Sequence, residues 1–205
     1  MRRVLTLGLT VALSTLMGIS FAQHDEHDHE HIHLGVRNGS AAVLEPEELA
    51  EPPHVLRYEM AEVVPGLFVR DTGWEFHFED GSPTPQLRQV TIQQVFISPG
   101  LVGVVEGELE PVFGQGRPGL LTLVFDPNDP DPGHWHVIFA TEQPPTEDNP
   151  LIFRFRLVEA IAWDGTRLND SSEYTLEFVP EPASLVALGT GLVGLVALRR
   201  RKRDR

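Results

Sequence analysis

Histidine is the residue type in this sequence whose number and spacing best fit a chemical role. Seven of the nine histidines fall in two clusters, and the first, QHDEHDHEHIH at residues 23–33, holds His27, His29, His31 and His33 at a spacing of two. In an extended chain this spacing places the four imidazoles on one side, about 6.5 to 7 Å apart. Neutral imidazole is the commonest ligand of zinc, copper and nickel, and the flanking acids concentrate cations. The segment is therefore predicted to bind metal.

The second cluster is His134-Trp135-His136, at the start of a predicted strand. Two imidazoles at i and i+2 of a strand lie on the same side and can share one ion. His31 and His33 begin another predicted strand. If these two strands are neighbours, the four imidazoles can converge on one tetrahedral ion. His54 and His77 are interpreted as exposed or hydrogen-bonding residues.

A second set of candidate ligands is the oxygen-rich sequence DPNDPDPG at residues 126–133. Calcium prefers clustered oxygens such as those of Asp126, Asn128, Asp129 and Asp131. The segment lacks the glycine spacing of a standard calcium loop, and three prolines stiffen it. We interpret it as a turn, and calcium is not an expected cofactor.

The sequence contains no recognisable catalytic motif. There is no cysteine, which excludes thiol catalysis and Cys-ligated metal, and no Gly-x-Ser-x-Gly, Walker or dinucleotide signature. A metal-dependent hydrolase would need an open coordination position and a general base, and no residue is singled out for either. We expect a protein that is not an enzyme.

The two ends of the chain have the composition of export and anchoring signals. Residues 1–22 combine Arg2 and Arg3, an apolar stretch and small residues before Gln23, as in a secretory signal peptide. Residues 183–198 are uncharged, about 24 Å long as a helix, and the basic stop that follows holds Arg199, Arg200, Arg201, Lys202 and Arg203. We expect a C-terminal transmembrane helix over 183–198 and a basic, cytoplasmic tail over 199–205.

The segment between these ends is strongly acidic. Eight of the 16 basic residues lie in the terminal segments, so eight arginines face 28 acids and the net charge is near −20. Such a surface repels nucleic acid, which is not an expected partner, and attracts cations. Residues 23–31 are low in apolar content and are expected to form a disordered arm.

From Ile32 onward the sequence indicates an all-β domain over residues 32–178. Short alternating segments such as 74–78 and 151–158 are separated by turn signals such as Asn38-Gly39 and Asp80-Gly81. A single helical turn is expected at 47–51, and residues 120–125 are interpreted as a core strand. About eight to ten short strands indicate an antiparallel β-sandwich or barrel-like domain.

The C-terminal segment resembles a known sorting signal. Pro180-Glu181-Pro182, the Gly-rich apolar run and the terminal Arg cluster are similar to the PEP-CTERM signal. The resemblance implies processing near Pro180–Pro182 by an exosortase-type enzyme, an inner-membrane anchor before processing, and final location on the cell surface or in the extracellular matrix of a Gram-negative bacterium. The segments HIHLGV and HWHVIF are also similar to zinc-regulated PEP-CTERM surface proteins, which implies zinc.

These observations lead to one principal hypothesis and one alternative. The principal hypothesis is an exported, non-enzymatic surface protein that binds a divalent transition metal, zinc first, through its histidines. The alternative is a structural or adhesive matrix component that binds exopolysaccharide. An exposed tryptophan could stack on a sugar ring of such a polymer. Trp74, Trp135 and Trp163 are nevertheless expected to be core or half-buried strand residues.

Overall fold

The computed structural model describes residues 31–181, which form ten strands and one helical turn. The strands connect into one mixed sheet in the order β2-β1-β4-β3-β10-β9-β5-β7, with β8 on β4 and β6 on β8. Their bounds are β1 Ile32–Arg37, β2 Ser40–Glu45, β3 Val55–Val64, β4 Leu67–Phe76, β5 Leu87–Ile97, β6 Val102–Val105, β7 Leu120–Val124, β8 His134–Thr141, β9 Leu151–Ala162 and β10 Tyr174–Pro180. The helical turn is α2, Glu47–Ala50.

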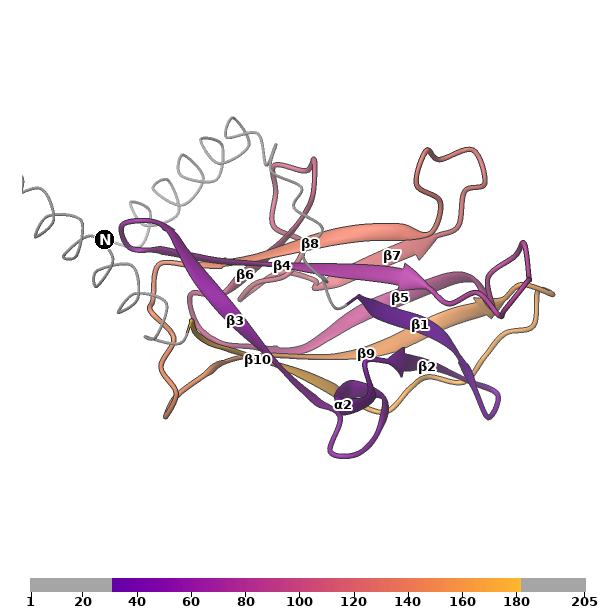
Figure 1. The fold of residues 1–205 in the computed structure, drawn as a ribbon, viewed down its shortest axis with the longest axis horizontal. Coiled ribbons are helices and arrows are strands. Elements are labelled where there is room, and N and C mark those ends of the chain that lie inside the picture. Colours follow the sequence, from indigo (N-terminus) through magenta and orange to yellow (C-terminus); the bar gives the residue numbers. More distant parts are fainter. Residues whose placement is uncertain (1–30, 182–205) are drawn as a thin grey trace, which may run out of the picture.

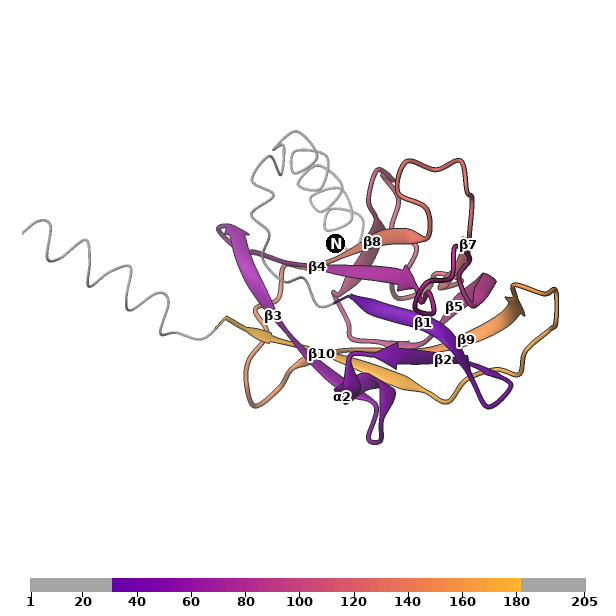
Figure 2. The same ribbon diagram turned by 45° about the vertical axis from the view of Figure 1, so that its right-hand side comes forward.

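The sheet folds into two layers because β3 passes from one to the other (Figure 1). The first half of β3 pairs with β10, over Val55–Met60, and its last residues pair with β4. Figure 2 shows the same arrangement after a turn, with β4 and β8 above β9 and β10. The two layers therefore share a strand, which explains why one continuous sheet can enclose a core.

The core between the layers is built from aromatic side chains of alternating strand positions. Trp74 of β4 meets Phe155 of β9 with ring centroids 5.1 Å apart, and Phe139 of β8 meets Phe153 of β9 at 4.9 Å. All four side chains are fully buried. Because side chains alternate along a strand, burying these residues turns the intervening polar residues to the outer face.

The prediction of a β-rich domain is confirmed, but its antiparallel character is wrong in two places. β1 runs parallel to β4, and β10 runs parallel to β3. Turn signals reveal only local hairpins, which are antiparallel, whereas these pairs join segments distant in sequence. The predicted strand at 74–78 is largely the end of a longer strand, β4, which begins at Leu67. The alternating pattern of β3 was overlooked.

Several local predictions are confirmed and others are corrected. Asn38 and Gly39, both with positive φ, turn β1 into β2, and α2 is the expected helical turn. Residues 120–124 form β7 at the end of the sheet order rather than a core strand, and Leu120 and Val124 are exposed. β10 continues to Pro180, two residues beyond the predicted end of the domain at 178.

The described part of the chain contains no helix with the length and apolar character needed to span a bilayer. The predicted signal peptide, residues 23–30 of the arm, and the predicted transmembrane helix and basic tail, Arg199 to Arg203 included, lie outside the described residues, as does Pro182. His31, which was assigned to the disordered arm, is described and packs on the sheet.

Candidate metal centre

Strand β4 is the frame of the histidine cluster because it lies between the two histidine-bearing strands. Thr72, Trp74 and Phe76 of β4 point into the core and are buried, which turns Asp71, Gly73 and Glu75 outward. β1 pairs with one edge of β4 and β8 with the other. The register aligns Glu75 with His33 on one side and with His134 on the other.

The two histidine strands are not neighbours, yet their imidazoles meet. The ring of His31 lies across β4 above Gly73, and its centroid is 4.6 Å from that of His134. The His134 ring is in turn 4.7 Å from the His136 ring, which lies beside Gly73 in the register. The rings of His31, His134 and His136 thus lie together across a third strand, and the ring of His33 is 6.4 Å from that of His31. The sequence-based hypothesis instead required the two histidine strands to be neighbours.

One group of three residues within the described range has ligand atoms close enough to hold an ion. One ligand atom from each of His31, His33 and Glu75 lies within 4.8 Å of the others. The Nδ1 atom of His31 is 3.2 Å from Oε2 of Glu75, and Nδ1 of His33 is 3.8 Å from Oε2 of Glu45. All three side chains are half-buried, so the group is reachable from solvent and partly shielded from it.

Carboxylates hold the δ nitrogens of the two histidines on β8. Nδ1 of His134 lies 2.7 Å from Oδ2 of Asp131, and Nδ1 of His136 lies 2.9 Å from both oxygens of Asp71. Since an ionised carboxylate only accepts hydrogen bonds, each Nδ1 donates, and the lone pair of the neutral ring is on Nε2. This is how metal-binding histidines are commonly oriented.

The Nε2 atom of His134 is buried and has no hydrogen-bond partner within the described residues. A buried nitrogen lone pair without a partner costs free energy, of order 1–3 kcal/mol, so it needs a compensating role. A metal ion on Nε2 would supply it. His134 is therefore the histidine of β8 whose position best fits a ligand.

The same carboxylates change the acidity of His136. Its hydrogen bond to Asp71 raises the pKa of the His136 imidazole above 6.5, burial opposes the shift, and the charges of Asp71, Glu106 and Asp131 add to it. A raised pKa favours the protonated ring, which cannot bind a metal. His136 therefore competes less well for a metal at neutral pH than an unperturbed histidine does.

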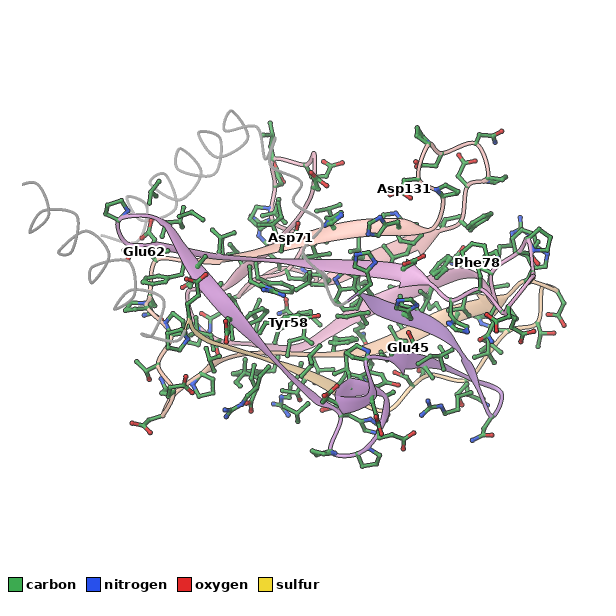
Figure 3. All side chains as sticks on the ribbon, viewed as in Figure 1. Glu45, Tyr58, Glu62, Asp71, Phe78 and Asp131 are labelled. Carbon is green, nitrogen blue, oxygen red and sulfur yellow. The ribbon has the colours of Figure 1, made fainter. Side chains whose placement is uncertain are left out.

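Figure 3 shows that the residues around the cluster come from separate parts of the chain, with Glu45, Asp71 and Asp131 labelled. Sequence reasoning missed the carboxylates Glu45, Asp71, Glu75 and Asp131 as parts of the site. It also set aside His77, whose ring is 6.1 Å from that of His33. The alternation of buried and outward-facing residues along β4 could have indicated that Asp71 and Glu75 face outward. It could not have indicated that β4 lies between the two histidine strands.

The remaining candidates lie apart from this cluster or outside the described residues. His54 contacts the carbonyl oxygen of Leu49 through Nδ1 at 2.9 Å, which confirms its reading as a hydrogen-bonding residue. Segment 126–133 is a turn, in which Asp126 and Asp129 accept backbone N–H bonds from Asn128 and Asp131. His27 and His29 lie outside the described residues.

Comparison with known proteins identifies the C-terminal segment. The family described as the PEP-CTERM protein-sorting motif matches residues 178–202, and no curated protein matches the chain. The match covers the sorting segment and does not extend to the histidine strands. This motif is the recognition signal of exosortase and implies export and C-terminal membrane anchoring before processing. The chain carries a PEP-CTERM sorting motif, which begins inside the last strand of its β domain.

Proposed function

We propose that this exported protein binds a divalent transition-metal ion, zinc before copper or nickel, without catalysing a reaction. The ligands are His31, His33 and Glu75, with His134 as the fourth. The observation that carries the proposal is the convergence of ligand atoms from His31, His33 and Glu75 within 4.8 Å, next to the imidazole of His134. Three imidazoles and one carboxylate are ligand types that zinc accepts in tetrahedral sites.

Two further observations support an ion at this place. The buried Nε2 of His134 has no partner, and Asp131 fixes the ring so that this nitrogen is an acceptor. Glu75 is aligned with His33 and with His134, so its carboxylate lies between the two histidine strands. A cation there would neutralise a locally acidic face that carries Glu45, Asp71, Glu75 and Asp131.

The surroundings favour holding an ion over using it in catalysis. Asp131 and Asp71 accept hydrogen bonds from the Nδ1 atoms of His134 and His136, a role that orients the rings. His27 and His29 precede the site by a few residues and supply additional imidazoles from the same chain. We therefore propose storage, buffering or transfer of the ion, with the histidine-rich segment loading the ordered site.

Calorimetric titration of zinc into residues 23–181 tests the proposal directly, because this segment retains the whole of β10. Wild type is expected to bind one ion tightly and further ions weakly. The double variant His31→Ala/His134→Ala should lose the tight phase, whereas His54→Ala, which removes a histidine outside the cluster, should keep it. If all three proteins bind several ions weakly and alike, the histidines are a loose chelator and the proposed site does not exist.

A second candidate function is the binding of exopolysaccharide. Two features outside the histidine cluster favour it, an exposed tryptophan and a polar depression. Trp163 is 43% exposed, in contrast to the buried Trp74, and an indole on the surface can stack on a sugar ring. A polar depression of about 350 Å³ on the β5–β9 side is lined by Gln93, Val158, Glu159, Arg167, Leu168 and Asp170. Loss of polymer retention in Trp163→Ala, with zinc binding unchanged, would support this second activity.

A further inference from the structure

We infer that the β3–β4 hairpin tip, Val63-Val64-Pro65, is a docking surface for the lipid membrane in which the chain's own C-terminal segment is anchored. The argument begins with two exposed valines in succession. Val63 is 41% and Val64 39% exposed, because the pairing of β3 with β4 shifts register between Glu62 and Val64. A shift of this kind interrupts the alternation that would otherwise bury one of the two side chains.

The register between β10 and β3 fixes where the anchor begins relative to this tip. Pro180 pairs with Met60, and the two strands run in the same direction. Beyond Met60, β3 continues to Val64 and the turn at Pro65, about 16 Å further at 3.3 Å per residue. β10 therefore ends at Pro180 while running toward the same end of the domain as the hairpin.

The length of the connection leaves little room between the domain and the membrane. The uncharged run begins at Ala183, three residues after Pro180, and three extended residues span at most about 11 Å. This is shorter than the length of about 16 Å along β3 that separates the tip from Met60, the partner of Pro180. The short connection therefore brings the tip close to the lipid interface.

The views of the molecule agree with this arrangement. The hairpin and the end of β10 lie at the same end of the domain in Figures 1 and 2, and Figure 3 labels Glu62 there. The carboxylate of Glu62 accepts the N–H of Gly66 at 2.7 Å and so closes the turn. The acids of the adjoining loop, Glu142, Glu147 and Asp148, are exposed. They disfavour anionic headgroups, so the surface fits a neutral, zwitterionic interface.

This orientation places the histidine cluster away from the lipid. Glu75 is eight residues from Leu67 along β4, about 27 Å from the hairpin end of the strand. The inference is independent of metal binding, since it uses only the strand register, the exposure of the tip and the sorting motif. It adds that the cluster is accessible from the exterior while the protein is still anchored.

Because the chain contains no cysteine, a single introduced cysteine can carry a reporter. The full chain is reconstituted through its own C-terminal segment into phosphatidylcholine vesicles that contain headgroup nitroxide lipid. A bimane label is placed at Val64→Cys and, as a control, at Val124→Cys, another exposed valine at the far end of β7. Pro65→Cys provides a second reporter if the first variant folds poorly.

The label at position 64 or 65 is expected to lose most of its emission, and the label at position 124 to keep it. Equal emission at both ends of the domain would overturn the inference. Quenching at position 64 that appears only when an exosortase-type enzyme is also present would overturn it as well. In that case the chain's own anchor is not sufficient to bring the tip to the lipid.

Discussion

The imidazole of His31 lies directly over Gly73, so closely that a Cβ added at position 73 would stand 2.5 Å from Cδ2 of the ring. Real side chains essentially never approach this closely, and Nε2 would lie at 3.0 Å. The missing side chain of Gly73 is therefore what allows His31 to cross β4 and reach His134. A glycine in a strand interior commonly marks such a close approach.

Replacing Gly73 by alanine should displace His31 and weaken tight zinc binding by at least about tenfold, since loss of ligand positioning typically costs 10–100-fold. The fold should persist, because φ at Gly73 is not positive and alanine is tolerated in a strand. Calorimetry measures the affinity and thermal unfolding the stability. Gly103→Ala is the contrasting control, because its Cβ meets Phe113 and Phe139 in the core. It should lower stability and leave affinity unchanged; the reverse pattern would contradict the role of Gly73.

Asp131→Asn should weaken zinc binding by about 10–100-fold without removing any ligand, as is usual for residues that orient metal-binding histidines. The amide no longer requires Nδ1 of His134 to be the donor, so the ring loses its fixed orientation. Zinc titration of Asp148→Asn, an exposed acid in the loop before β9, provides the charge-matched control. Equal affinities for the two variants would show that Asp131 acts only through its charge.

The His136–Asp71 pair makes stability depend on pH in a definite direction. The pKa of His136 is raised in the folded protein. The pair therefore stabilises the folded state fully at pH values below the ordinary pKa of histidine, and this stabilisation is lost as the pH rises through the raised pKa of the folded protein. With chelator present, Asp71→Asn should therefore unfold at a lower temperature than wild type near pH 5.5, and the difference should shrink toward pH 9. A difference that grows with pH would mean that the neutral ring, not the imidazolium, is favoured by Asp71.

Thr72 provides a test of the core independent of the metal centre. Its Oγ1 accepts the indole N–H of Trp74 at 2.9 Å and donates to the carbonyl of Val137 at 2.8 Å. Thr72→Val keeps the shape but removes the acceptor of the buried Trp74 N–H, which should cost about 1–3 kcal/mol in the free energy of unfolding. Thr175→Val, at a half-buried position for which no side-chain hydrogen bond is seen among the described residues, should cost less than about 0.5 kcal/mol. Denaturant unfolding of both variants distinguishes the two sites.

The start of the sorting motif is part of the core, which a truncation can reveal. Phe178 is fully buried and Val179 is nearly so. A chain that ends after Glu177 should lose at least about 3–5 kcal/mol relative to one that ends after Glu181, the range for removing a buried aromatic side chain. Urea midpoints report the difference. Equal midpoints would mean that β10 contributes nothing beyond Glu177.

From the sequence, the alternating histidines could be predicted as candidate ligands on two strands. The strand β4 that lies between those two strands could not be predicted. Periodicity identifies which face of a strand is buried, and that was sufficient for Ile32, Leu34 and Trp74. Pairing between distant segments leaves no such local signal. The parallel pairing of β1 with β4 and the position of Glu75 between His33 and His134 could therefore not be predicted. Edge position is hidden for the same reason, which is why β7 was read as a core strand.

The pairing of β10 on both sides has a mechanical consequence for an anchored protein. Six residues of β10 pair with β3 and five with β9, and the bonds run across the strand axis. Tension that pulls on Pro180 along the strand loads both rows of bonds in shear, so they must rupture together and not one after another. The point where the tether leaves the domain is thus reinforced against force from flow or from attached polymer.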